Sequence, residues 1–170
     1  MGVVEVGGSV AVSSGSAYEF AGWVEPHLVA MSRFAGRLVP EADRDDLVQE
    51  ALVRAWRRWS TYDAARGAPL VWLLAIVADQ GRRHRVRSPV PSLQLHDADG
   101  RGALNEADVD LERAIARLST RQREAVDLYY FVDLDIATIA EVMRCASGTV
   151  KATLHQARAR LRDLLGDPDD

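Results

Sequence analysis

The stretch DIATIAEVMRCASGTVK at residues 135–151 predicts two helices joined by a tight turn. Apolar side chains recur through it at the spacing of one helix face, and the same period continues to residue 165. Two helices in this arrangement form a helix-turn-helix, a motif that places its second helix in the major groove of duplex DNA. The second helix is therefore the first candidate for a functional surface.

The predicted second helix has a buried stripe and a polar outer side. We expect the stripe to consist of Val150, Leu154, Ala157, Leu161 and Leu165. The residues expected to face outward are Ala152, His155, Gln156 and Ala159, with Lys151, Arg158 and Arg162 on the flanks. Gln156 suits a bidentate contact with adenine and Lys151 a contact with guanine or phosphate, each worth about 1–3 kcal/mol of discrimination. Ser147 and Thr149 are expected to cap the helix or to donate to a phosphate, and the sequence leaves both roles open.

Composition places the chain among ordinary globular proteins. Its 170 residues are 48% hydrophobic, which is enough to build small cores. Cys145 is the only cysteine, so no intrachain disulfide forms, and the four histidines show no metal-ligand spacing with it. No metal or cofactor is predicted. The sequence also lacks a signal-peptide pattern and an apolar run near the roughly 20 residues of a membrane span, so we expect a cytoplasmic protein without membrane insertion.

The charge distribution divides the chain into segments. The net charge is −4, and residues 88–110, with five acids and one arginine, carry this whole excess. Pro89 and Pro91 end a helical pattern, so residues 88–108 are predicted to be an acidic linker. The Gly- and Ser-rich residues 1–16 are predicted to be a flexible tail.

The fold expected is all-α, with one small helical domain at 17–87 and another at 109–166. The predicted helices lie near 18–38, 42–59, 69–86, 109–118, 120–131, 135–143 and 147–165.

The helix predicted at 42–59 has two different sides. Its apolar side is expected to be buried and comprises Leu47, Val48, Ala51, Leu52, Ala55, Trp56 and Trp59. Its other side comprises Asp46, Gln49, Glu50, Val53 and Arg57, with one apolar residue among polar and charged ones. A solvated face and a protein-docking surface both fit this pattern.

The loop after that helix and the next helix combine aromatic and basic residues. The loop runs from Tyr62 to Pro69, Trp72 follows it, and residues 82–87 read RRHRVR. Stacking on aromatic rings together with cationic contacts to phosphates suits single-stranded DNA. The alternative is structural, because Trp72 also fits a core and basic residues near a helix C-terminus complement the helix dipole.

Taken together, these motifs resemble bacterial sigma factors of the extracytoplasmic-function (ECF) group, in the sigma-70 superfamily. The resemblance spans both domains in the same order. It rests on DLVQE at 46–50, on Tyr62, Arg66-Gly67 and Trp72-Leu73, on LSTRQRE at 118–124, on IAE at 139–141, on SGTVK at 147–151 and on LHQARARL at 154–161. A helix-turn-helix alone is shared by many regulators. The acidic Gln-Glu helix upstream, at the separation found in this family, makes the resemblance specific.

The resemblance implies a non-catalytic initiation factor whose partners are core RNA polymerase, through its beta and beta-prime subunits, and promoter DNA. An anti-sigma factor would be a further partner. The first domain corresponds to sigma region 2 and the second to region 4. Polymerase contacts are implied for Asp46, Gln49, Glu50, Val53 and Arg57. Contacts to the melted −10 element are implied for Tyr62, Arg66, Asp79, Arg82, Arg83 and Arg85. Contacts to the −35 element are implied for Ser147, Thr149, Lys151, Ala152, His155, Gln156 and Arg158.

The sequence departs from the family pattern at several positions. Asp79 replaces a common Asn of the base pocket, Ala75 replaces a common Arg, and Arg144 occupies a turn position that usually holds Gly, Asn or Asp. Hydroxyl and cationic residues are also lost at Ala152, Thr153 and Gln156, which predicts an unusual or weaker promoter preference.

Two other function classes remain open. A helix-turn-helix regulator acting without polymerase would bind duplex DNA alone, but it leaves the polar face of residues 46–57 unexplained. A sigma-like scaffold held by an antagonist would bind its partners without supporting initiation. An enzyme is the least favoured class, because there is no Gly-rich phosphate loop and no nucleophile beside a base.

Overall fold

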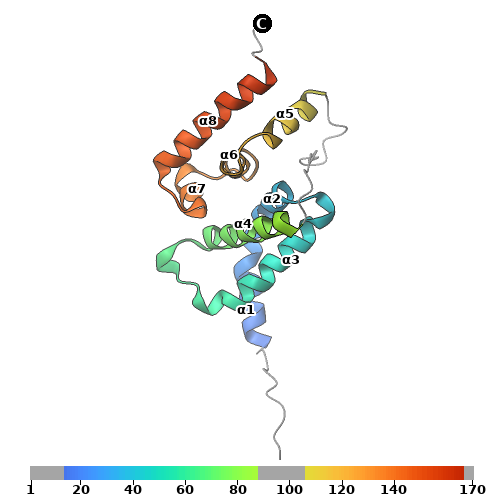
Figure 1. The fold of residues 1–170 in the computed structure, drawn as a ribbon. Coiled ribbons are helices and arrows are strands. Elements are labelled where there is room, and N and C mark those ends of the chain that lie inside the picture. The colour runs from blue at the N-terminus through green and yellow to red at the C-terminus, as the bar shows by residue number, and fades with distance from the viewer. Residues whose placement is uncertain (1–13, 88–105, 167–170) are drawn as a thin grey trace, which may run out of the picture.

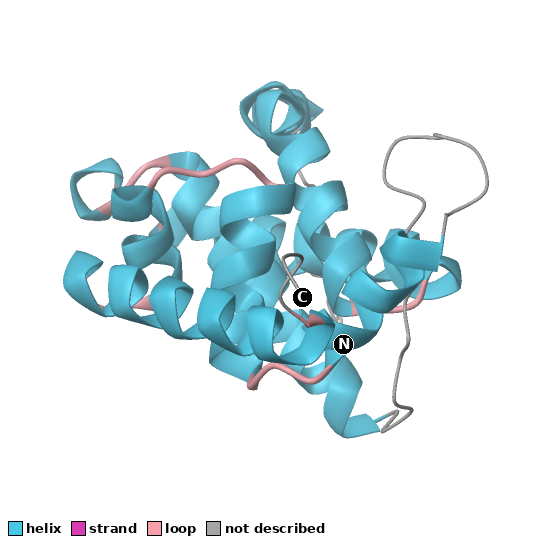
Figure 2. Ribbon diagram, turned by 90° about the horizontal axis from the view of Figure 1, so that it is seen from above, coloured by secondary structure: helices cyan, strands magenta, loops and turns pink. Residues whose placement is uncertain are grey.

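A computed structural model of the protein describes residues 14–87 and 106–166. Helices dominate both ranges, and neither contains a β-strand (Figure 2). Figure 1 shows two helical bodies, one from each range, stacked against each other. The predicted all-α fold of two helical halves is confirmed. The predicted tail and linker fall largely outside the described residues.

The first half begins with a helix that is broken near its middle. Helix α1 spans Ser14–Val24, the short 3-10 helix η1 spans Glu25–His27, and α2 spans Leu28–Leu38. Pro26 has no backbone N–H and cannot continue an α-helical ladder, which accounts for the break. The prediction of one continuous helix at 18–38 was wrong at this point.

Two longer helices complete the first half. Helix α3 spans Glu41–Arg58, and α4 spans Pro69–Arg87. The loop between them contains the 3-10 helices η2, Trp59–Thr61, and η3, Ala64–Arg66. Helices α2, α3 and α4 pack mutually around a core whose largest fully buried side chains are Met31, Phe34, Leu73, Leu74 and Val77.

The second half is a bundle of four α-helices. Helix α5 spans Glu106–Ala116, α6 spans Thr120–Val126, α7 spans Ile136–Met143 and α8 spans Ser147–Leu165. A π-helical turn, η4 at Asp127–Phe131, follows α6 directly. Ser119 and Gln122 form a capping box at the start of α6, and the Asp135 carboxylate accepts the Thr138 N–H at the start of α7. The predicted helix-turn-helix is thus formed by α7 and α8.

A buried arginine joins the two halves. The Arg37 Nε on α2 donates to Asp127 Oδ1 at 2.8 Å, and its Nη1 donates to Glu112 Oε1 at 2.8 Å. The Arg37 guanidinium carbon also lies 3.8 Å from the centroid of the Phe131 ring. Helix α7 packs on α4 beside this contact. A charge-assisted bond is strong where water is excluded, and the same burial imposes a desolvation cost on both charges.

Asp127 is the most constrained charged group of this interface. It has no solvent exposure, and its Oδ2 has no hydrogen-bond partner. Burial raises the pKa of Asp127 to about 6, although Arg37 acts in the opposite direction. Burial also disfavours the charge on Arg37, yet Asp127 and Glu112 hold its pKa above the usual value. The arginine therefore stays charged, and the carboxyl group is the one that titrates.

We expect Asp127 to make stability depend on pH. The pKa of this carboxyl is about 6 in the folded protein, against an ordinary value of 3.8, so its contribution to stability is full below about pH 4 and is lost as the pH rises through 6. The loss amounts to about 3 kcal/mol. In Asp127→Asn, urea unfolding at pH 4 to 7 should lack this decline, whereas Asp163→Asn, at an exposed carboxylate, should retain it. Parallel pH curves for Asp127→Asn and the unaltered protein would contradict the assignment.

Candidate nucleic-acid interface

The loop between α3 and α4 is held by local hydrogen bonds. The Tyr62 hydroxyl donates to the Gly67 carbonyl at 3.0 Å, and Asp63 Oδ1 accepts the Ala65 N–H at 2.9 Å. Gly67 has φ of 150°, a conformation that residues with side chains rarely adopt. These constraints fix the path of the chain and leave the Arg66 side chain exposed at the end of the loop.

An aromatic cluster anchors the same loop to the bundle. Its members come from α1, α3, the loop and α4, and they are Phe20, Trp23, Trp56, Trp59, Tyr62 and Trp72. The ring centroids of Tyr62 and Trp72 are 5.4 Å apart, and each lies within 6 Å of the Trp23 centroid. Trp72 is half-buried in this cluster, so it packs structurally and also reaches the cavity described next.

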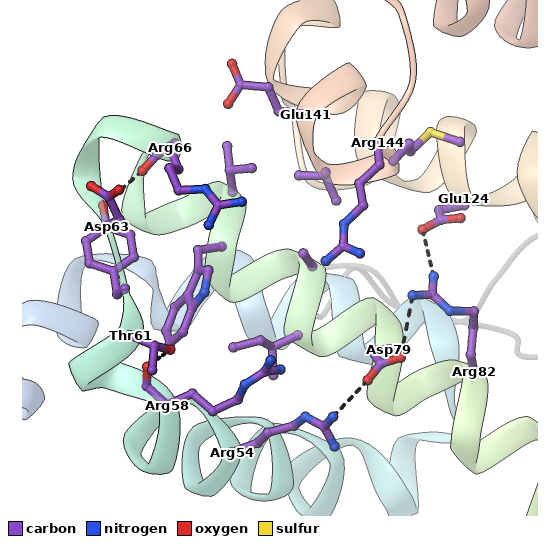
Figure 3. Close-up of a pocket in the computed structure, with 18 of the residues that line it drawn as sticks. Arg54, Arg58, Thr61, Asp63, Arg66, Asp79, Arg82, Glu124, Glu141 and Arg144 are labelled. Atoms are coloured by element: carbon purple, nitrogen blue, oxygen red, sulfur yellow. Dashed lines mark hydrogen bonds and ion pairs between the residues drawn. The ribbon is translucent and has the colours of Figure 1, made fainter.

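A cavity of about 1050 Å³ opens beside the loop (Figure 3). Four residues predicted to contact the −10 strand line it together: Tyr62, Arg66, Asp79 and Arg82. Two others predicted for the same role, Arg83 and Arg85, are not among its lining residues. Arg54 and Arg58, which were not predicted from the sequence, also line the cavity. Their spacing of four residues on α3 places them on one helix face and was the available signal.

Asp79 is paired with three arginines. Its carboxylate oxygens lie 3.0 Å from Arg83, 3.5 Å from Arg54 and 3.8 Å from Arg82. Because these cations are held by one carboxylate, Asp79 both orders this surface and weakens its attraction for phosphates.

The second half of the chain forms the opposite wall of the cavity. Its lining residues there include Arg121, Glu124, Glu141 and Arg144, from α6 and α7 and the turn after α7. Glu124 Oε1 lies 3.6 Å from Arg82 Nη1, an ion pair that crosses between the halves. Burial raises the pKa of Glu124 above its usual value, with Arg82 opposing it. The surface predicted for the melted strand is therefore covered in this arrangement.

The polar side of α3 lies at the surface of the first half. The five side chains predicted for polymerase contact are all exposed: Asp46, Gln49, Glu50, Val53 and Arg57. The opposite side is buried at Leu47, Ala51 and Ala55. Val53, in the middle of this polar face, is 51% exposed.

The recognition helix α8 presents the residues that the sequence placed on its outer side. Those predicted for the −35 element are all exposed: Ser147, Thr149, Lys151, Ala152, His155, Gln156 and Arg158. Several details differ from the prediction. Ala159, expected to point outward, and Leu161, expected to be buried, are both half-buried. Leu165 is 46% exposed rather than buried, because it lies in the last turn beyond the bundle. The helix cap predicted at Ser147 or Thr149 is not formed, since the N-cap residue is Ala146 and no side chain caps it.

Tyr130 is a neighbour of this surface that the sequence analysis did not identify. Arg158 Nε donates to the Tyr130 hydroxyl at 2.8 Å, and the Tyr130 ring is 52% exposed. The π-helical turn at Asp127–Phe131 directs Asp127 into the interface and Tyr130 toward α8. A regular helical period in the sequence does not predict the directions that this π-helical turn gives to Asp127 and Tyr130.

The part of the chain that the structure describes holds neither a metal-binding cluster nor a membrane-spanning helix. Across 14–87 and 106–166, no cluster of His, Cys, Asp and Glu side chains has a geometry that could hold a metal ion. None of the helices in these ranges is long and apolar enough to cross a membrane.

Comparisons with known proteins agree with the two-part organisation. The family model for sigma-70 region 2 matches residues 23–88, and the model for sigma-70 region 4 matches residues 108–161. The RNA polymerase sigma-E factor of Streptomyces avermitilis is 34% identical, over 93% of this chain and 91% of that protein. The ECF RNA polymerase sigma factor SigL of Mycobacterium tuberculosis is 32% identical, over 81% of this chain and 84% of that protein.

Solved structures of sigma factors also resemble this chain. CnrH, solved in complex with the cytosolic domain of CnrY, has a TM-score of 0.70 and 27% identity, over 92% of this chain and 93% of that chain. The sigma factor RpoE of Bartonella quintana, solved with the anti-sigma factor NepR, has a TM-score of 0.69 and 28% identity, over 88% of this chain and 98% of that chain. The family models, the relatives and the fold define a sigma-type transcription factor. The chain belongs to the sigma-70 family, in its ECF group.

Replacement of Asp79 should change the affinity for single-stranded DNA. In Asp79→Asn the three paired arginines lose their shared carboxylate, so a fluorescent oligonucleotide should bind about threefold to fivefold more tightly at low salt. Asp45→Asn, at an exposed acid on α3, serves as the control. Weaker binding of a cytosine-containing strand by Asp79→Asn would instead indicate that the carboxylate accepts from the cytosine amino group.

Proposed function

We propose that this ECF sigma factor uses three separate surfaces to start transcription at selected promoters. The polar face of α3 docks on core RNA polymerase, the loop after α3 with the adjacent part of α4 holds the melted −10 strand, and α8 reads the −35 element. The observation that carries this proposal is the exposure of both predicted docking faces, on α3 and on α8, in a chain of this family.

The polymerase surface is supported by its chemistry. Acidic, amide and cationic side chains surround the exposed Val53, so an apolar centre is bordered by polar groups. This pattern is typical of a protein interface, in which a small apolar core is enclosed by a polar rim. A solvated face remains the alternative, and the affinity of α3 variants for core polymerase separates the two. A partner of core polymerase would act in the cytoplasm.

An antagonist protein is a further proposed partner. CnrH and the Bartonella quintana RpoE were both solved as complexes, with CnrY and the anti-sigma factor NepR respectively. Their likeness to this chain, over nine-tenths of its length, supports a similar partner here. A regulator acting without polymerase is the competing function, and polymerase binding separates the two.

Charge reversal on α3 should weaken polymerase binding selectively. Glu50→Lys or Arg57→Glu removes one cross-interface pairing and adds a repulsion, so the affinity for core polymerase should fall about tenfold or more. The measurement is a titration of labelled sigma factor with bacterial core enzyme. The matched controls, Glu19→Lys and Arg33→Glu, alter exposed residues on α1 and α2 and should bind as the unaltered protein does. Equal affinity for all five proteins would exclude the α3 face as the docking surface.

Substitutions on α8 should alter promoter choice without loss of polymerase binding. In Gln156→Ala the proposed adenine contact is lost, and in Lys151→Ala the guanine or phosphate contact is lost, so discrimination at one −35 position should drop about tenfold. Reconstituted transcription on a library of −35 sequences measures this, with Arg113→Ala on α5 as the control. An unchanged library profile would remove both residues from the reading surface.

A further inference from the structure

The cavity between the two halves is lined by an unusual excess of arginine. Six arginines and four carboxylates contribute to its walls. Arg58 and Arg66 reach into the open space from the first half, and Arg144 reaches into it from the second (Figure 3). None of these three side chains has a hydrogen bond or ion pair with any described residue. Three guanidinium groups from separate elements thus line one cavity without forming an ion pair with any described carboxylate.

The four carboxylates do not neutralise this space. Asp79 is engaged by Arg54, Arg82 and Arg83, and Glu124 is engaged by Arg82. Asp63 accepts a backbone N–H within its own loop. Only Glu141 remains as an unpaired acid among the lining residues of this cavity. In addition, the Arg54 Nε in its wall is buried and has no partner.

Arg144 has a backbone conformation that argues for a specific role. Its φ of 52° and ψ of 53° lie in the left-handed region, where it ends α7 and forms the turn of the helix-turn-helix. A non-glycine residue is strained there, and such strain concentrates at binding sites. The same turn position directs the Arg144 side chain across the interface toward Arg66 and Arg58 (Figure 3). Neither packing nor pairing with a described residue explains an arginine at this position.

We propose that the cavity binds a small, multiply charged phosphate compound of nucleotide size, which bridges the two halves through Arg58, Arg66 and Arg144. A volume of about 1050 Å³ is sufficient for such a ligand, since ligand pockets commonly span roughly 300–1,000 Å³. Guanidinium groups bind phosphate oxygens in paired hydrogen bonds, and two or more phosphates can engage arginines on both walls. The bound compound would favour the closed arrangement, because its contacts to both halves exist only there.

This site differs from the proposed −10 surface in one decisive residue. A melted DNA strand would contact the first half, which contributes Arg58 and Arg66. The bridging compound also requires Arg144 of the second half. Dependence of binding on Arg144 therefore distinguishes a bridging ligand from a phosphate bound at the strand surface alone.

The experiment titrates the full chain with inorganic tripolyphosphate, and separately with magnesium-free ATP, at 150 mM NaCl. Trp72 lines the cavity, so tryptophan fluorescence reports binding, and calorimetry gives the stoichiometry. We expect saturable one-to-one binding that weakens about tenfold in Arg66→Ala and in Arg144→Gly. Glycine tolerates the left-handed conformation, so Arg144→Gly should keep or raise the thermal unfolding midpoint while losing affinity. Arg160→Ala, at an exposed arginine of α8 outside the cavity, should bind normally.

Two results would overturn the proposal. Binding that disappears at 150 mM NaCl would identify a nonspecific electrostatic attraction to a basic surface. Binding that depends on Arg66 but is unaffected in Arg144→Gly would place the anion on the first half alone. The titration contains neither DNA nor polymerase, so its outcome is independent of whether the proposed promoter and polymerase contacts are correct.

Discussion

The contact on which the arrangement of this protein depends is the buried bond between Arg37 and Asp127. A fully buried carboxylate with one unpartnered oxygen is costly, and it is retained because the Arg37 guanidinium neutralises it and Glu112 completes the group. Arg37 belongs to the first half of the chain and both acids belong to the second. The two bodies are therefore joined by polar chemistry that neither could satisfy alone.

The π-helical turn at Asp127–Phe131 makes that contact geometrically available. It adds a wider turn directly after α6, so that Asp127 faces α2 while Tyr130 reaches Arg158 on the recognition helix. One local irregularity thus serves both the interface between the halves and the surface of α8. Wide turns of this kind are frequent at functional sites, because they redirect side chains that a regular helix would place elsewhere.

The packing of the two bodies against each other also explains why the cavity between them is rich in arginine. Helix α4 and the loop before it bring cations suited to phosphates, and the turn after α7 adds Arg144 to the same space. The ion pair between Arg82 and Glu124 closes one side, while the guanidinium groups of Arg58, Arg66 and Arg144 stay unpaired with any described residue. An arrangement stabilised by pairing at one end and left cationic at the other is suited to recognising an anion between its halves.

The sequence by itself determined the helical elements, the polar face of α3 and the outward face of α8. Those features follow from a period of 3.6 residues and from local capping, which act over a few neighbouring positions. The break at Pro26 was also readable from the chain, although the analysis predicted a continuous helix there. Only the tertiary structure decided that Arg37 meets Asp127, that Arg54 and Arg58 join the cavity, and that Arg144 crosses the interface. Those contacts depend on how the two helical bodies dock, and no local periodicity in the sequence encodes that docking.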